Sequence, residues 1–424
     1  MIKHLLSKSN LYNAINKVVI NGGSSGVDGL KVEQLYDHLK QNGNGYVQQI
    51  STCNYKTGAI LGVEIPKSNG GVRLLGIPTV VDRMFQQALC QILEPLFEPS
   101  FCKHSYGFRP NRNAQDAVKQ SLLNINKGYR HIVDIDLKKF FDEVEHYVLL
   151  ELIYKKVKSK EVLKLLRSFL RAPIQIKGKL QKRRKGVPQG SPLSPLLSNI
   201  ILNELDKELE KRGHRYVRYA DDFSIYVRSK LAAKRVGNSI YKFLKDVLIL
   251  PINHSKSGIR RPLTFEILGY SFVSSYQKGS KGKYQLVVSK SRWKTLKQKL
   301  KQLSRKTVPI SFTERIRRLN LLIRGWLNYF KLASMQAKLK KLDEWLRNRL
   351  RYCIWHHWKK RDRKRKNLIR LGVKSGQAYA WSRSRMGGWA IAQSPILGTT
   401  ITKARLEKRG YLTMLNYYIK IRNH

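Results

Sequence analysis

Acidic residues are scarce in this sequence, which contains 28 Asp and Glu against 83 Lys and Arg and has a formal net charge of +55. An excess of this size is larger than solubility requires and indicates a polyanionic partner. Phosphate backbones fit best, because each neutralised phosphate releases condensed counterions and the attraction steers association. An acidic membrane surface fits less well, since the sequence has neither a lipid-facing amphipathic segment nor a lipidation signal.

Cysteines and long apolar runs are also few. The four cysteines lie far apart and form no CxxC pair, so neither a disulfide framework nor a zinc module is indicated, and a reducing cytoplasm is the simplest compartment. No run approaches the ~18 apolar residues of a membrane span. Because 42% of the residues are hydrophobic, the chain can still bury substantial cores, and its 424 residues predict about two to three domains.

The N-terminal part of the chain contains a predicted hairpin. Residues 1–50 indicate two helices joined by a glycine-rich loop at 21–29, which could cradle a phosphate but lacks the Lys-Ser/Thr ending of a P-loop. Residues 61–78 alternate like a strand, turn at 69–71 and alternate again, which predicts the hairpin. Helical periodicity resumes after it.

A second group of elements follows. Residues 131–153 are expected to run a strand directly into a helix, with Asp136 at the junction. Residues 186–213 form a turn-rich loop and an amphipathic helix, and residues 215–227 form a second hairpin. The order strand, helix, helix, hairpin predicts an α+β palm, not the regular alternation of a doubly wound sheet.

Carboxylates are concentrated in this second group. Half of the acids, 14 of 28, lie in residues 131–250, and Asp221 and Asp222 stand at the tip of the predicted hairpin. A palm-type sheet could bring them to one edge together with Asp136, where the three acids would repel one another without cations. Two Mg²⁺ ions about 3.5 to 4 Å apart would neutralise them and bridge a nucleoside triphosphate. There are two alternatives. Asp136 could only cap the next helix, and Asp221 and Asp222 could be ordinary solvated residues of a turn.

The C-terminal part has the opposite balance, with 26 basic and 4 acidic residues between 291 and 370. Ser311 and Glu314 have capping-box spacing, and we expect a helix after them with one packed face and its arginines facing out. The run at 358–366 mixes aromatic and basic residues, which either contact nucleic acid or form a solvated charged face. The apolar positions of the expected helix are Ile316, Leu319, Ile323, Trp326, Leu327 and Phe330.

An ordered series of motifs resembles the reverse transcriptases encoded by bacterial group II introns, also called intron maturases. The blocks are NGGSSGVDG, IPKSNGGVRLLGIPTVVDR, SYGFRPNRNAQDAV, VDIDLKKFFD, GVPQGSPLSPLLSNIILNELD, RYADD, INHSKS, ILGYSF and RGWLNYFK. A single block is a weak signal, whereas the ordered series is specific. The compact length, without a C-terminal nuclease, most resembles the small group IIC members. Second-strand cleavage is therefore not expected, and the primer would come from elsewhere.

The resemblance implies an α+β right-hand polymerase followed by an α-helical thumb and a small basic DNA-binding module. The expected domains are fingers and palm with an N-terminal extension at 1–290, the thumb or maturase X domain at 291–362, and the basic module at 363–424. The implied function is an RNA-directed DNA polymerase that copies intron RNA into cDNA during retrohoming and binds that RNA to assist splicing. Its implied partners are group II intron RNA, an RNA template/DNA primer duplex, target DNA and deoxynucleoside triphosphates, in the nucleoid-associated cytoplasm of a bacterium.

Carried over residue by residue, the resemblance also assigns a site. Asp136 and Asp221 would be the principal ligands of two Mg²⁺ ions, for which Mn²⁺ could substitute, and Asp222 would be a supporting acid. The residues expected to bind the nucleotide are Lys67 and Arg73, which would hold the triphosphate, Phe141, which would exclude a ribose 2′-hydroxyl, Gln189, which would line the nascent pair, and Lys256, which would lie near the phosphates.

Other readings remain open for several of these residues. Phe141 could pack in the core, as we expect of Phe140, while Gln189 could be a loop-packing residue and Lys256 a solvated one. A splicing-only maturase and a retron- or defence-type reverse transcriptase are the competing functions. The presence of all the acids and fingers cations favours polymerisation, and the thumb and basic tail favour an intron enzyme. The expected nucleic-acid contacts of that tail are Arg361, Arg363, Lys364, Arg365 and Lys366.

Overall fold

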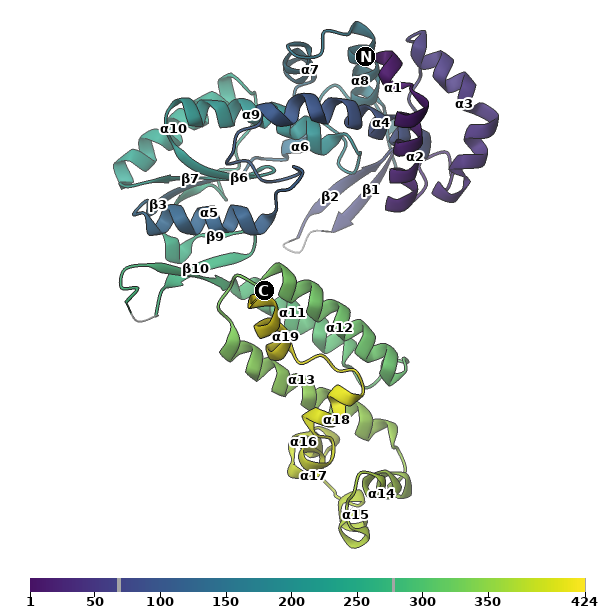
Figure 1. Cartoon of the computed structure of the whole chain (residues 1–424), viewed down its shortest axis with the longest axis vertical. Coiled ribbons are helices and arrows are strands. Elements are labelled where there is room, and N and C mark those ends of the chain that lie inside the picture. Colours follow the sequence, from purple (N-terminus) through teal and green to yellow (C-terminus); the bar gives the residue numbers. More distant parts are fainter. Residues whose placement is uncertain (67–69, 277–278, 424) are drawn as a thin grey trace. The chain divides into compact units, whose positions relative to one another are not determined.

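The computed structural model describes residues 1–66, 70–276 and 279–423 and contains two compact units, Met1–Arg261 and Pro262–His424 (Figure 1). The first unit mixes helices and strands, and the second is mostly helical. Among the described residues, no helix combines the length and the apolar character needed to cross a bilayer.

Helices make up most of the first unit, and its main core lies among them and the second of its two sheets. The two helices expected in residues 1–50 are present as α2 and α3. The helical elements are α1 (Ile2–Leu5), α2 (Lys8–Asn21), η1 (Val32–Gln34), α3 (Leu35–Ser51), α4 (Val80–Phe97), η2 (Glu98–Ser100), α5 (Ala114–Asn126), α6 (Phe140–Glu143), α7 (His146–Tyr154), α8 (Lys160–Arg171), α9 (Ser194–Lys211) and α10 (Lys230–Asp246).

The first sheet of this unit contains the predicted N-terminal hairpin. Strands β1 (Ile60–Pro66) and β2 (Val72–Ile77) pair antiparallel, which confirms the prediction. Strand β4 (Ile174–Ile176) runs parallel to β1, and β5 (Lys179–Gln181) completes the order β2-β1-β4-β5.

The second sheet has the order β6-β7-β3-β8, and all of its pairs are antiparallel. Its strands are β3 (His131–Ile135), β6 (Arg215–Tyr219), β7 (Asp222–Val227) and β8 (Gly258–Arg260). The β6–β7 pair is the second predicted hairpin, which is therefore confirmed.

Helices cover both faces of this second sheet (Figure 1). On one face the Tyr226 hydroxyl donates to Ser121 Oγ of α5 at 2.7 Å. On the other face Val133 lies against the backbone of Gly237 in α10. Alternate strand residues point to opposite faces, so the sheet buries side chains on both of them.

The expectation that β3 runs directly into a helix is wrong. After Ile135 the chain crosses a loop in which Lys139 has a left-handed backbone conformation, with φ of +48°, and only then forms α6. A residue in that conformation cannot continue either a strand or a helix, so it breaks the run. Lys139 is the N-cap of α6, so Asp136 does not cap that helix.

The second unit starts with a sheet of order β11-β10-β9. The C-terminal helix α19 packs on α12 and α13, α16 packs on α13, and α14 packs on α15. The elements are η3 (Pro262–Thr264), β9 (Glu266–Ile267), β10 (Tyr270–Ser274), β11 (Tyr284–Val288), α11 (Lys290–Leu303), α12 (Phe312–Tyr329), α13 (Gln336–His357), α14 (Arg361–Arg370), α15 (Ser375–Ser382), α16 (Gly388–Gln393), α17 (Pro395–Thr400), α18 (Lys403–Lys408) and α19 (Met414–Arg422).

Helix α12 begins as predicted, because Ser311 is its N-cap and accepts a hydrogen bond from the Glu314 backbone N–H at 3.1 Å. The expectation that its arginines all face out is wrong for Arg315, which is 1% exposed. Its guanidinium donates hydrogen bonds to the carbonyls of Leu303 and Val308, among others. These loop carbonyls would otherwise be buried without hydrogen-bond partners. The residues of the expected apolar face that are buried are Ile316, Leu319, Ile323, Leu327 and Phe330.

Candidate active site

The three predicted acids of the second sheet line one cavity of about 560 Å³. In the register of the sheet, Ile135 pairs with Phe223, so Asp136 and Asp222 are the next residues of their strands at the same end. Asp221 lies in the tight connection between Tyr219, the last residue of β6, and Asp222, the first of β7. Strand pairing alone thus brings together acids that are far apart in the sequence.

The turn that carries the adjacent acids has an unusual backbone. Ala220 has φ of +58°, at the first loop position of a two-residue hairpin connection where glycine is the common residue. An alanine in this conformation costs roughly 1–2 kcal/mol. Phe108 and Lys139, which line the neighbouring cavity walls, also have positive φ. Backbone strain of this kind tends to be concentrated at functional sites.

The carboxylates of this cavity are crowded together, although four basic side chains also line it. Although Asp222 opens onto the cavity, it is closely surrounded by protein, and this desolvation together with the like charges of Asp221, Asp136 and Asp134 raises its pKa to about 6. Desolvation also raises the pKa of Asp221, and the charge of Arg73 opposes that rise. The site therefore holds carboxylates that would be stabilised by added positive charge.

Asp136 is oriented by the loop that contains the INHSKS motif. Its Oδ2 accepts a hydrogen bond from Asn253 Nδ2 at 2.8 Å, and Lys256 Nζ lies 3.8 Å from the same oxygen. Its backbone N–H donates to Ser257 Oγ at 3.0 Å. Lys256 was predicted, whereas Asn253 and Ser257 were not singled out, although they stand in the same motif.

The remaining predicted nucleotide residues line the same cavity, apart from Lys67, which lies outside the described residues. Arg73 Nε donates to Gln189 Oε1 at 2.5 Å. Phe141 is 9% exposed and has its ring centroid 5.2 Å from that of Phe140, which is in the core as expected. Arg73, Gln189, Phe141 and Asp221 also line an adjoining cavity of about 530 Å³.

The donor chemistry of the cavity fits a hard cation, although the acids do not form a ready-made centre. In the described part of the chain, no three His, Cys, Asp or Glu side chains are grouped closely enough to hold a metal ion. Carboxylate oxygens are nevertheless the ligands that Mg²⁺ prefers. Desolvation and, after it, the charges of the neighbouring acids raise the pKa of Asp222, and a bound cation would favour its ionised form. The residues that could hold such an ion are Asp136, Asp221 and Asp222.

The five basic residues predicted to contact nucleic acid belong to α14 in the second unit, and they fall into two groups. Lys364 Nζ lies 4.5 Å from the ring centroid of Trp355 in α13. The Arg365 guanidinium lies 5.5 Å from the ring centroid of Tyr379 and donates to Ser375 Oγ, both in α15. These two cations hold α14 against its neighbours, so α14 is not a uniformly solvated face. The exposed members are Arg361, Arg363 and Lys366.

Comparisons with known families give two matches. Residues 65–272 match the family described as "Reverse transcriptase (RNA-dependent DNA polymerase)", and residues 293–372 match "Group II intron, maturase-specific domain". The first range contains all three acids of the cavity, and the second contains α12, α13 and α14.

Curated relatives include bacterial and yeast proteins. Protein YkfC of Escherichia coli is 30% identical over 273 residues, which cover 55% of this chain and 71% of YkfC. The group II intron-encoded protein LtrA of Lactococcus lactis is 35% identical over 208 residues, which cover 48% of this chain and 33% of LtrA. The putative COX1/OXI3 intron 2 protein of Saccharomyces cerevisiae is 29% identical over 311 residues, covering 59% of this chain and 35% of that protein.

Two solved structures resemble the chain more distantly. Telomerase from Candida albicans, in complex with a fragment of telomeric RNA, has a TM-score of 0.44 and 12% identity, covering 81% of this chain and 68% of that one. A chain of a Cas6-RT-Cas1–Cas2 complex has a TM-score of 0.37 and 24% identity, covering 58% of this chain and 26% of that one.

Proposed function

Since the chain belongs to the family of group II intron-encoded reverse transcriptases and maturases, we propose that it is an RNA-directed DNA polymerase that copies its intron RNA into DNA. The observation that carries this proposal is the cavity at the end of the second sheet of the first unit. Three carboxylates from two separate segments line it together with Arg73, Phe141, Gln189 and Lys256.

The chemistry proposed is nucleotidyl transfer assisted by two metal ions. When bound, two Mg²⁺ ions would favour the ionised primer 3′-hydroxyl and stabilise the leaving pyrophosphate. Asp136 and Asp221 are the proposed ligands, and Asp222 contributes negative charge beside them. Asn253 keeps Asp136 Oδ2 oriented through its 2.8 Å hydrogen bond.

The nucleotide would enter between β2 and the carboxylates. Arg73 would bind the triphosphate, and its hydrogen bond to Gln189 fixes the direction of the guanidinium. Phe141 would contact the sugar, because its ring is packed beside Phe140 and cannot easily move away from a 2′-hydroxyl. Lys256, which is 58% exposed, would contact phosphate while it remains close to Asp136.

The second unit would bind intron RNA and target DNA. Its 22 net positive charges between 291 and 370, the difference between 26 basic and 4 acidic residues, suit the phosphate backbone. The exposed cations on α14 would contact phosphates. This binding would assist splicing of the same RNA.

Primer extension tests the central proposal. The purified chain should extend a DNA primer on an RNA template with deoxynucleotides only when Mg²⁺ or Mn²⁺ is present. Asp221→Ala should lose extension while it keeps the RNA affinity of the wild type. Extension that persists in Asp221→Ala would place the active site elsewhere, and a wild-type protein that binds intron RNA without extending primers would favour a splicing-only maturase.

A further inference from the structure

A fully buried ion pair lies directly behind the turn that carries Asp221 and Asp222. The Arg218 and Asp206 side chains are both 0% exposed, and Arg218 Nε donates to Asp206 Oδ1 at 2.8 Å and to Oδ2 at 2.9 Å. A buried pair of this kind is weak evidence for added stability, because the cost of removing two charges from water offsets their attraction. Its position therefore calls for another explanation.

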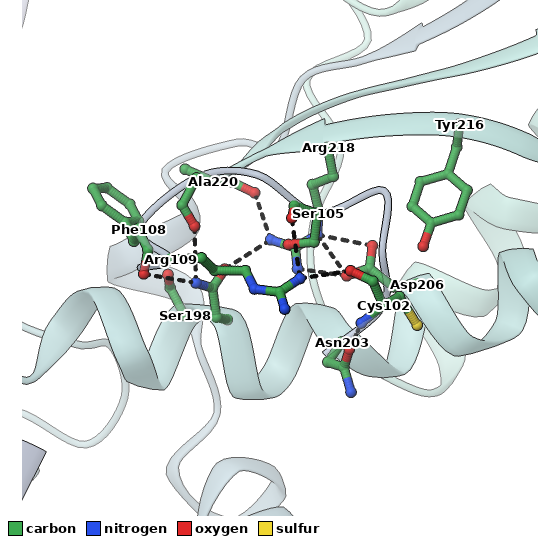
Figure 2. Close-up of polar contacts among 12 residues, drawn as sticks. Cys102, Ser105, Phe108, Arg109, Ser198, Asn203, Asp206, Tyr216, Arg218 and Ala220 are labelled. Atoms are coloured by element: carbon green, nitrogen blue, oxygen red, sulfur yellow. Dashed lines mark hydrogen bonds and ion pairs between the residues drawn. The ribbon is translucent and has the colours of Figure 1, made fainter. Parts of the chain in front are cut away.

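The guanidinium does more than neutralise Asp206. Its Nη1 donates to the backbone carbonyl of Ala220 at 3.0 Å (Figure 2). The same nitrogen donates to Asn199 Oδ1 at 3.0 Å. Ala220 is the residue with φ of +58° that immediately precedes Asp221. One rigid fork thus joins helix α9, which supplies Asp206 and Asn199, to the strained residue of the turn.

A second segment supports the turn from another side. Gly107 packs so closely that a methyl group at this position would overlap the Ala220 backbone nitrogen. Asn199 Nδ2 donates to the Gly107 carbonyl at 2.9 Å, so the same asparagine contacts both Arg218 and Gly107. The backbone of Arg218 is also bonded to this segment, through His104 O at 3.0 Å and the Tyr106 N–H at 2.9 Å. Ala220 is therefore fixed from two directions.

We propose that the buried Arg218–Asp206 pair, with Asn199 and Gly107, is a positioning device that holds Ala220 in its left-handed conformation and thereby sets the orientation of Asp221 and Asp222 for metal binding. This inference rests on the proposed function, since it assumes that these acids hold the metal ions. Arg218 is a positioning residue here, because it acts through the Ala220 carbonyl and does not itself contact substrate. Partners that orient metal ligands typically contribute 10- to 100-fold to metal affinity.

Mn²⁺ binding to the purified full-length chain tests the proposal without relying on catalysis. The electron paramagnetic resonance signal of free Mn²⁺ falls as the ion binds, which gives a dissociation constant. Arg218→Lys keeps the charge beside Asp206 but loses the fork, so it should weaken Mn²⁺ binding by about tenfold or more. Gly107→Ala should also weaken Mn²⁺ binding, because the added methyl group would displace Ala220 while the Arg218, Asp206 and Asn199 side chains are unchanged. This variant replaces Arg218→Lys in the test if Arg218→Lys does not fold.

A glycine at position 220 separates positioning from general destabilisation. Glycine adopts positive φ without support, so adding Ala220→Gly to Arg218→Lys should restore part of the Mn²⁺ affinity. If Arg218 only stabilised the core, the Ala220→Gly change would not restore the Mn²⁺ affinity lost in Arg218→Lys. Extension assays should agree, with the Mg²⁺ concentration for half-maximal rate raised in Arg218→Lys and lowered again in the double variant.

Two matched controls complete the design. Arg315→Lys changes another buried arginine that donates to backbone carbonyls, but in the second unit, and should leave Mn²⁺ binding unchanged. Gly45→Ala adds the same methyl group as Gly107→Ala at a glycine with no atom within 4 Å of the added group. Folded Arg218→Lys and Gly107→Ala proteins that bind Mn²⁺ like the wild type would overturn the positioning role. Unchanged Mn²⁺ binding in Asp136→Ala and Asp221→Ala would instead overturn the proposed function.

Discussion

The carboxylate cavity of the first unit and helix α14 of the second unit both gather several charges of one sign, but they hold them in different surroundings. In the cavity, desolvation and the neighbouring acids together raise the pKa of Asp222 to about 6. On α14, Arg361, Arg363 and Lys366 are exposed, and water and salt screen their repulsion. Charges in the cavity are therefore strongly coupled to one another, whereas those on α14 should act nearly independently. Removing charges one at a time from each region tests this difference.

The largest effect is expected in the cavity. Asp136→Ala removes a proposed metal ligand and should reduce the rate of primer extension by roughly 100-fold or more, since a metal ion supplies several kcal/mol of transition-state stabilisation. Asp222→Asn should be milder, because it removes only supporting charge. The measurement is single-turnover extension on a preannealed primer, and equal losses in the two variants would contradict the division into principal and supporting acids.

Neutralising the cations of α14 should have a graded effect on binding. Replacing Arg361, Arg363 and Lys366 by Gln should weaken the affinity for intron RNA and lower the slope of log affinity against log salt by roughly 0.7 to 0.9 for each lost phosphate contact. Extension at low salt should be largely kept. Replacing Lys364 and Arg365 instead should lower the melting temperature, since these two pack on Trp355 and Tyr379.

Filter binding over a range of salt concentrations and thermal unfolding distinguish these two groups. A variant with all five residues replaced should show both weaker RNA binding and a lower melting temperature. If the exposed trio leaves affinity and slope unchanged, this part of α14 is only a solvated face.

The sugar-selection prediction tests packing in the cavity. Phe141→Ala should admit ribonucleotides, with a loss of discrimination of about tenfold, because the bulk against the 2′-hydroxyl is removed. Phe140→Ala is the comparison variant, because Phe140 packs beside Phe141 in the same core and also lines the cavity. It should lower stability by roughly 3–5 kcal/mol without changing sugar selection, since only Phe141 is expected to contact the sugar. The test is competition between deoxynucleotides and ribonucleotides, and unchanged discrimination in Phe141→Ala would assign Phe141 to the core.

The smallest effect is expected on α12. Glu314 Oε2 accepts from Arg317 Nε at 2.6 Å and Glu314 Oε1 from Arg318 Nε at 2.7 Å, so two outward arginines are already paired. Glu314→Gln should free them for phosphate and raise RNA affinity a few-fold, with a steeper salt dependence. These hydrogen bonds lower the pKa of Glu314 to about 2, so lowering the pH cannot replace the mutation in a binding assay. Unchanged or weaker binding by Glu314→Gln would contradict the expectation that Arg317 and Arg318 contact phosphate.

The positions of the cavity acids were predictable because they depend on local patterns. Asp136 ends an apolar run of strand type, and the Tyr-Ala-Asp-Asp stretch stands between two such runs, so antiparallel pairing sufficed to bring them to one end of a sheet. The start of α12 was predictable for the same reason, since a cap needs only residues three apart. The bounds of the three expected domains remain a prediction.

Other features depend on contacts that no local pattern records. Arg315 reads as one more surface cation, and its burial follows from the carbonyls of the preceding loop. The break before α6 results from the backbone of Lys139, a residue type that rarely adopts positive φ. Arg218 stands next to the Tyr-Ala-Asp-Asp motif, but its partner Asp206 lies in the preceding helix, where the sequence alone does not distinguish it from the nearby Glu204, Glu208 and Glu210.

The path of the chain after α13 has an evolutionary consequence. The chain forms the paired helices α14 and α15, returns to α13 through α16, and ends in α19, which packs on α12 and α13. The α14–α15 hairpin is therefore a detour whose two ends are anchored on the same helix. Surface detours of this kind tolerate insertion, deletion and replacement well. Mutation can therefore lengthen, shorten or exchange it while α12, α13 and α19 keep their packing.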